Sequence, residues 1–168
     1  MTLEIRRIRS GEYDEVGELI VGSYGHNGYL VLPDGSFDDD YADELRAADR
    51  RDDEAEVWVA VDGDELLGCV TWCQAGSPYR ELAVDDSQAE FRGLAVAPAA
   101  RGRGAGRALV EYCLERARSE GLSEVVLCSL PEMRPAHSLY ESLGFARRPE
   151  LDWSPAEGVV LWAFSVAI

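Results

Sequence analysis

A short segment combines glycine and arginine in a chain that is otherwise rich in acids. It reads Arg101-Gly102-Arg103-Gly104-Ala105-Gly106-Arg107, and the chain as a whole has a formal net charge of −16. Glycine lets the main chain approach a ligand closely, and the free N–H groups at the start of a helix attract anions. A helix with the apolar stripe Leu109, Val110 and Cys113 is predicted to follow directly. The segment therefore predicts a cradle for a phosphate or pyrophosphate group.

The spacing within this segment narrows the kind of phosphate ligand. The loop that binds nucleoside triphosphates, Gly-x-x-x-x-Gly-Lys-Ser/Thr, needs a Lys and a hydroxyl residue after its last glycine, and neither follows Gly106. The dinucleotide motif Gly-x-Gly-x-x-Gly beginning at Gly102 would need a glycine where Arg107 stands. Another phosphate-bearing ligand is therefore predicted, and a surface turn with solvated arginines is the alternative.

Two motifs in order carry a resemblance to a known family. Leu94-Ala95-Val96-Ala97-Pro98 followed by Arg101-x-x-Gly104-x-Gly106 resembles the Arg/Gln-x-x-Gly-x-Gly/Ala acetyl-CoA motif of the GNAT superfamily of N-acetyltransferases. The run from Ala136 to Phe145, AHSLYESLGF, is similar to the downstream helix of that family and the strand after it. The match covers residues 89 to 145. One departure is Met133, which stands where many members place an Asn that contacts the cofactor.

The resemblance implies acetyl-CoA as co-substrate. No metal is expected. It implies that the main chain of Leu94, Ala95 and Val96 pairs with the pantetheine arm like an added strand. The pyrophosphate would be held by amides and by three converging arginines in the run Arg101, Gly102, Arg103, Gly104, Ala105, Gly106 and Arg107.

The acetyl acceptor needs a route for its proton, because an alkyl ammonium has a pKa of about 10.4 and only the neutral amine attacks. Glu90 is the predicted base, since similar family members carry an acidic base at its strand position. A water chain is another route, and an ordinary strand-edge carboxylate is the alternative interpretation of Glu90. Three loop acids are reserve bases: Glu81, Asp85 and Asp86.

Tyr140 is the predicted proton donor to the leaving CoA thiolate, because it occupies the helix position of the family's general acid. Its helical spacing with Leu139 and Leu143 equally fits a packing role. His137, one turn earlier, is expected to be a surface or packing residue. Cys128 is a nucleophile only in principle, since an apolar strand raises the pKa of a thiol, so direct attack in a ternary complex is predicted.

These residues predict an acetyl-CoA-dependent N-acetyltransferase that moves an acetyl group to a primary amine. A non-catalytic acyl-CoA-binding sensor and a transferase for a larger acyl-CoA are the alternatives. The intact Gly102, Gly104 and Gly106 indicate cofactor binding in all three cases and do not distinguish them. The motifs do not specify whether the acceptor is a small-molecule amine or a protein amine. Its pocket is expected from the loops at 22–36, 76–86 and 148–158.

Composition sets the wider limits. The 168 residues, 46% of them hydrophobic, suit one domain spanning 1–168. No apolar run approaches the roughly 20 residues of a membrane span, so no membrane partner and a cytoplasmic location are expected. The net charge of −16 argues against a nucleic-acid partner and suits a cationic amine, although acidity is first a solubility trait. A homodimer is an expectation only.

Periodicity and turn residues predict the elements that position these residues. An Asp62-Gly63 turn joins two strands as a hairpin. Ser10 is predicted to cap the first helix, and Gly22 to Gly35 to form a loop. Strands are predicted at 3–8, 57–61, 66–72, 91–96, 125–130, 145–148 and 159–166, and further helices at 37–51, 104–120 and 135–143. Together with the resemblance, this predicts a single GNAT-like α/β domain with a mixed, mostly antiparallel sheet of about seven strands and helices on both faces, in which strands 91–96 and 125–130 are parallel neighbours.

The four cysteines lack the Cys-x-x-Cys spacing of a metal or redox motif. They are expected to be reduced thiols, buried in the fold: Cys69, Cys73, Cys113 and Cys128.

Overall fold

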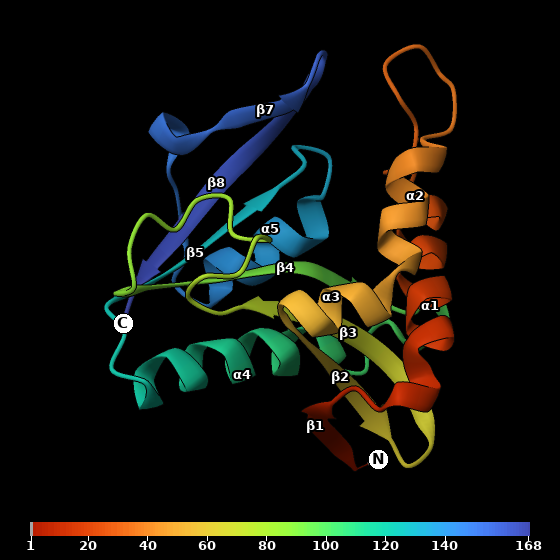
Figure 1. The fold of residues 1–168 in the computed structure, drawn as a ribbon, viewed down its shortest axis with the longest axis horizontal. Helices are drawn as coiled ribbons and strands as arrows, with labels where there is room; N and C mark the ends of the chain where they lie inside the picture. The colour runs from red at the N-terminus through yellow and green to blue at the C-terminus, as the bar shows by residue number, and fades with distance from the viewer. Residues whose placement is uncertain (1) are drawn as a thin grey trace.

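Eight strands form one sheet in the computed structural model, which describes residues 2–168 (Figure 1). The strand order is β1-β2-β3-β4-β5-β8-β6, and β7 pairs with β8. Only the pairing of β4 with β5 is parallel among the described strands, which confirms the mixed, mostly antiparallel sheet. The strands are β1 (Leu3–Arg7), β2 (Glu56–Asp62), β3 (Glu65–Cys73), β4 (Gln88–Val96), β5 (Glu124–Ser129), β6 (Ala146–Arg147), β7 (Trp153–Ala156) and β8 (Val159–Ala167).

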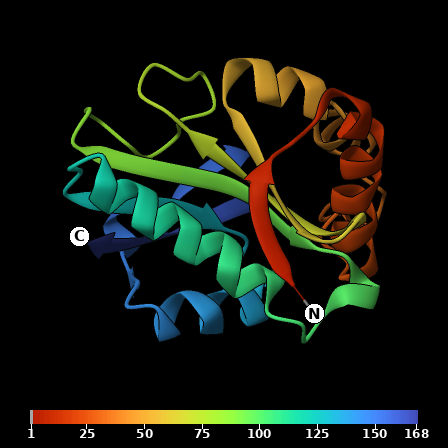
Figure 2. The same cartoon turned by 90° about the horizontal axis from the view of Figure 1, so that it is seen from below.

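Helices cover both faces of the sheet, as Figure 2 shows. One face carries α1 (Tyr13–His26), α2 (Asp39–Arg46) and α3 (Ala48–Glu54), and the other carries α4 (Ala105–Ser119) and α5 (Arg134–Ser142). Side chains alternate along a strand, so each strand supplies both cores. Val57, Val59 and Val61 of β2 pack on the α1 side, whereas Ala60 joins the core beneath α4.

The first predicted helix was wrong at both ends. Ser10 begins a 3₁₀ turn, Ser10–Glu12, and α1 starts only at Tyr13. The helix then continues through Gly22 and Gly25 to His26, so the predicted loop begins later. Its buried face, which includes Val16 and Ile20, outweighs the roughly 1 kcal/mol that each interior glycine costs.

The single helix predicted over 37–51 is two helices separated at Ala47. Asp38 provides the N-cap of α2, because its carboxylate accepts the N–H of Tyr41 at 3.0 Å. The break at Ala47 turns α3 away from the axis of α2, and both helices border the pocket described below. Strand β7 was not predicted, because its sequence Trp-Ser-Pro-Ala does not alternate.

The parallel pair β4 and β5 is joined only at one end. Gln88, Ala89 and Glu90 pair with residues 124–126. Beyond Glu90, β4 is paired only with β3, and the rest of β5 only with β8. The two strands predicted to be parallel neighbours are therefore confirmed as neighbours, but they separate after three residue pairs. The main chain of 94–96 has no strand partner on the β5 side.

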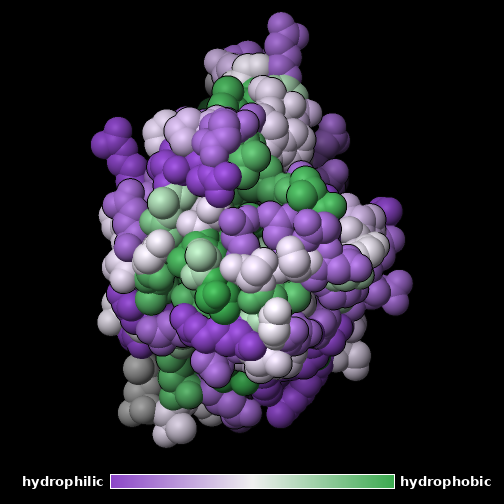
Figure 3. Space-filling model, turned by 90° about the vertical axis from the view of Figure 1, so that its left-hand side faces the viewer, coloured by the Kyte–Doolittle hydropathy of each residue, from purple (hydrophilic) through white to green (hydrophobic). Residues whose placement is uncertain are grey.

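The face drawn in Figure 3 is mainly polar. Figure 3 shows hydrophilic side chains over one face, with apolar groups scattered between them. No helix within residues 2–168 combines the length and the apolar content needed to cross a membrane.

Candidate active site

The turn between β4 and α4 presents unpaired main-chain N–H groups. Within residues 2–168, no N–H from 101 to 107 donates to a protein acceptor, and the first to do so is that of Ala108, to the carbonyl of Gly104 at 3.0 Å. Gly102 and Gly104 have φ of 79° and 85°, a conformation that favours glycine, and a Cβ on either would meet no atom within 4 Å. The turn is thus an open set of donors at a helix N-terminus, which fits an anionic group.

The arginines of this turn do not converge as predicted. Arg103 forms ion pairs with Asp62 and Glu65, both at 3.0 Å, because the β2–β3 turn lies beside it. Arg107 donates to Ser142 Oγ at 2.8 Å. Arg101 is exposed and makes no ion pair within residues 2–168. The main chain, with Arg101, is therefore the part of the turn left free for a ligand.

Tyr140 of α5 packs beside the separated strands. Its ring lies 6.1 Å from that of Phe91 and 5.7 Å from that of Phe145, and the residue is 4% exposed. Its hydroxyl makes no hydrogen bond to another group of residues 2–168. Burial, with smaller contributions from Cys113 and Cys128, raises the pKa of the phenol well above its usual value. The side chain serves the core and also keeps a protonated hydroxyl at neutral pH.

Glu90 lies on the opposite face of β4 from Phe91. It is 1% exposed, and its carboxylate accepts three successive main-chain N–H groups, from Glu81, Leu82 and Ala83, at 2.8 to 2.9 Å. Burial raises the pKa of Glu90, and these three donors oppose that effect. The carboxylate therefore anchors the loop before β4, and its lone pairs are largely occupied.

Glu81, brought in by that anchored loop, spans the separated strands. Its Oε1 accepts from Arg92 of β4 at 2.9 Å, and its Oε2 accepts from Cys128 Sγ of β5 at 2.9 Å. Burial, and next the charge of Glu81, raises the pKa of the Cys128 thiol, which therefore stays protonated. The sequence suggested Glu81 only as a reserve base, but in the structure its carboxylate contacts both strands.

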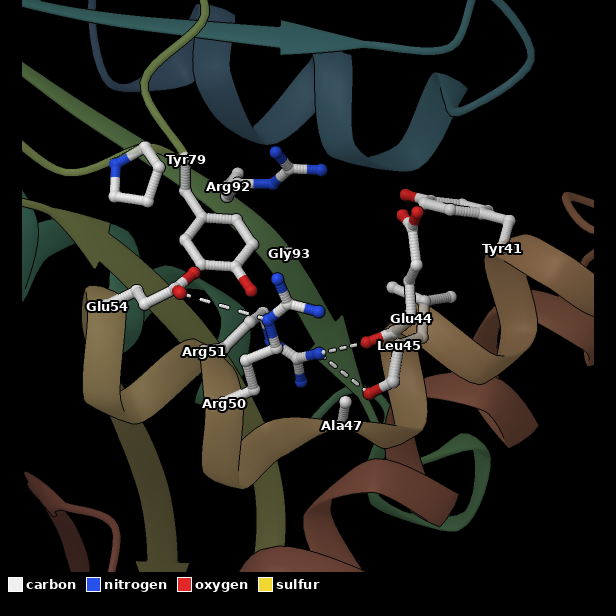
Figure 4. A pocket seen from close by; sticks show the side chains of 11 residues that line it. Tyr41, Glu44, Leu45, Ala47, Arg50, Arg51, Glu54, Tyr79, Arg92 and Gly93 are labelled. Carbon is white, nitrogen blue, oxygen red and sulfur yellow. Dashed lines mark hydrogen bonds and ion pairs between the residues drawn. The ribbon is translucent and has the colours of Figure 1, made fainter.

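A pocket of about 290 Å³ opens beside β4 at Arg92 and Gly93, on the face covered by α2 and α3 (Figure 4). We call it the α2–α3 pocket. Its lining comes from α2 and α3, from the loop after β3 and from β4: Tyr41, Glu44, Leu45, Ala47, Arg50, Arg51, Glu54, Pro78, Tyr79, Arg92 and Gly93. Because Gly93 directly precedes the segment 94–96, which lacks a strand partner on the β5 side, the pocket and the open strand edge adjoin.

Comparison with known proteins identifies the family. The model of the Acetyltransferase (GNAT) family matches residues 18–145. The chain belongs to this family. Solved GNAT structures share the fold: the PaiA N-acetyltransferase of Thermoplasma acidophilum in complex with coenzyme A has a TM-score of 0.77 at 14% identity, with each chain fully covered. A GNAT acetyltransferase of Staphylococcus aureus has a TM-score of 0.70 at 13% identity, over 99% of both chains.

Relatives that are more similar in sequence align only in part. N-acetyltransferase family 8 member 2 of Rattus norvegicus is 34% identical over 54% of this GNAT chain and 38% of its own length. The mycothiol acetyltransferase of Geodermatophilus obscurus is 35% identical over 67% of the chain and 36% of its own length. N-acetylaspartate synthetase of Danio rerio is 37% identical over 56% and 31%. The chain thus spans about a third of the length of the curated relatives it matches.

His137 is a packing residue in this GNAT chain. It is 8% exposed, stacks on Trp162 with ring centroids 5.7 Å apart, and lies 3.0 Å from Ser129 Oγ through Nε2. Burial lowers the pKa of its imidazole. Met133, at the position of the family's Asn, presents its sulfur to Ser129 Oγ at 3.4 Å. A hydrogen-bonding side chain is thus missing at that position.

Sequence reasoning did not single out most of the residues that line the α2–α3 pocket. Of the three loops expected to form the acceptor pocket, 76–86 lines the α2–α3 pocket, through Pro78 and Tyr79. The rest of the lining comes mainly from α2 and α3.

Proposed function

We propose that this chain is an acetyl-CoA-dependent N-acetyltransferase that acetylates a primary amine by direct attack in a ternary complex. The single observation that supports this most is the separation of β4 from β5 directly before a helix N-terminus with free N–H groups. An extended arm can add to the unpaired edge at 94–96 while the turn at 101–107 holds the pyrophosphate. The likeness to a GNAT structure that contains coenzyme A agrees with this arrangement.

The residues present fit acetyl-CoA. Glycine at 102 and 104 leaves open space at the turn, and the donors there have no partner among residues 2–168. When bound, acetyl-CoA supplies an acetyl group activated as a thioester. The chain itself has to bind it, place an amine beside it and move two protons.

We propose Glu81 as the group that takes the amine proton, directly or through water. It lies at the separated strands, paired with Arg92 at 2.9 Å. Glu90, the base predicted from the sequence, then acts through Glu81, because its carboxylate fixes the main chain of 81–83. In this arrangement Glu90 is a positioning residue.

Tyr140 is the proposed proton donor. An amine that attacks the thioester carbonyl forms the new N–C bond while the C–S bond breaks, and the departing sulfur needs a proton. The Tyr140 phenol holds its proton at neutral pH, as a tyrosine of ordinary pKa, about 10, also does, and burial raises that pKa further. Its hydroxyl has no competing partner within residues 2–168.

The direct test is release of CoA thiol from acetyl-CoA in the presence of a broad panel of amines. Amine-dependent release with formation of the N-acetylated product is the expected result. Binding of acetyl-CoA without turnover of any amine would instead support the acyl-CoA sensor. Faster turnover of propionyl- or succinyl-CoA than of acetyl-CoA would support the larger-acyl transferase.

A further inference from the structure

The α2–α3 pocket contains a buried guanidinium that has no carboxylate partner. Arg51 is 5% exposed, and no Asp or Glu of residues 2–168 lies within ion-pair distance of it. Its Nη1 donates to the carbonyls of Glu44 and Leu45 at 2.9 and 2.8 Å, and its Nε has no partner. Burying a cation without a counterion is costly, so the position calls for an explanation.

The charges around the pocket suit a ligand that carries both a positive and a negative group. Arg50 and Arg92 also line the pocket, although Arg92 is paired with Glu81 and Arg50 approaches Glu54 only at 3.9 Å. Glu44 lines the pocket as well and makes no ion pair within residues 2–168. In a chain of net charge −16, three guanidinium groups thus gather around one cavity, beside a free carboxylate.

We propose that the acetyl acceptor is an amino acid or a similar amine that carries a carboxylate, and that Arg51 binds this carboxylate in the α2–α3 pocket. This rests on the proposed acetyltransferase function and names its substrate class. A guanidinium matches the two oxygens of a carboxylate with parallel N–H donors. With the carboxylate at Arg51, the amine of the same molecule can extend toward Gly93 and the open strand edge. The pocket volume of about 290 Å³ suits a molecule of this size.

The test uses three acceptors for each side chain: an L-amino acid, its primary amide and the amine without the carboxyl group. The wild-type chain should acetylate the amino acid with a kcat/KM about 10- to 100-fold higher than that of the amide, the range of a charged hydrogen bond. In Arg51→Met the preference for the amino acid over the amide should disappear, and turnover of the amide should stay within about threefold of wild type. Arg118→Gln, a change of an exposed arginine on α4, should leave the ratio unchanged.

Arg51 also holds the end of α2, so its loss could act through folding alone. Thermal unfolding of each variant measures that effect. A purely structural role would lower kcat/KM of all three acceptors equally, and an unchanged ratio would overturn the proposal. If Arg51→Met does not fold, Arg51→Lys is used instead. An ammonium keeps the positive charge but lacks the paired N–H donors of a guanidinium, so the ratio of kcat/KM for the amino acid to that for the amide should fall by at least about threefold.

A binding measurement separates this proposal from the catalytic one. In calorimetry with the CoA complex, N-acetyl amino acids should bind more tightly than their amides, and Arg51→Met should remove the difference. That result without any turnover would keep the carboxylate site and reject the transferase. Turnover of amines with no carboxylate preference in either assay would keep the transferase and reject the carboxylate site.

Discussion

The donor side and the acceptor side of the proposed active site are built from different parts of the chain. The donor side is made of main chain: the strand edge at 94–96 and the N–H groups of 101–107. The acceptor side is made of side chains from α2, α3 and the loop after β3, and Arg51 and Glu81 are the charged residues to which we give roles there. Main-chain sites depend on glycine and strand spacing, whereas side-chain pockets depend on how distant segments meet.

The largest effect is expected at Tyr140, the proposed proton donor. Tyr140→Phe should lower kcat by about 100- to 10,000-fold, because the ring stays in the core and only the proton donor is lost. Affinity for acetyl-CoA, measured by calorimetry, should remain near that of wild type. A variant that unfolds at lower temperature but turns over at the wild-type rate would leave Tyr140 with packing alone.

Glu81 and Glu90 form the next comparison. Glu81→Gln should lower kcat by about 100-fold at neutral pH and recover in part at high pH, where more of the amine is already neutral. Glu90→Gln should instead speed amide hydrogen exchange at 81–83, since an amide side chain offers one acceptor where a carboxylate offers two.

The outcome that would reverse these two roles is specific. If Glu90→Gln loses turnover with unchanged exchange at 81–83 and recovers at high pH, Glu90 is the base. If both variants turn over at the wild-type rate, the amine proton leaves through a water chain and neither carboxylate is the base.

A smaller effect is expected at the donor turn. Gly104→Val should weaken acetyl-CoA binding by at least about tenfold, because a φ of 85° costs a branched residue about 1–3 kcal/mol and the loop must change to relieve it. Gly121→Val is the matched control, since Gly121 follows the other end of α4 with a φ of 71° and open space around it. It should lose similar stability with unchanged binding, and equal binding losses in both variants would refute the cradle.

The smallest effect is expected at Arg103. Arg103→Gln should change acetyl-CoA affinity by less than about threefold, because its guanidinium is paired with Asp62 and Glu65, and such exposed pairs contribute about 0–1 kcal/mol. Arg101→Gln, with no such partners, should weaken binding more. Calorimetry at low salt compares the two, and a larger loss at Arg103 would restore the predicted convergence of arginines.

Local patterns were enough to predict most of the sheet. The Val57, Val59, Val61 alternation and the Asp62-Gly63 turn gave the hairpin, and the glycines after Val96 gave the start of α4. The errors fell where tertiary contacts override local preference. One such tertiary contact is at Gly17, where a Cβ would lie 2.5 Å from the carbonyl of Arg46, so α1 and α2 approach too closely for any side chain.

The candidate site divides in the same way. Glu90 was singled out from its strand position, but no local pattern indicates that its carboxylate meets three N–H groups of the preceding loop. Arg51 is also invisible locally, since its burial follows from the break at Ala47 and from the packing of α3 on β2. Sequence spacing gives the residues of a main-chain site, and only the fold reveals which side chains share a cavity.

The separation of β4 from β5 gives the sheet an unpaired edge in its interior. An arm that pairs there would complete the sheet as well as deliver an acetyl group, and the native state would gain free energy with each increase in donor concentration. For a ligand at 100 times its Kd that gain is about 2.7 kcal/mol. The supply of acetyl-CoA in a cell would then govern how long the chain resists proteolysis, in addition to how fast it works.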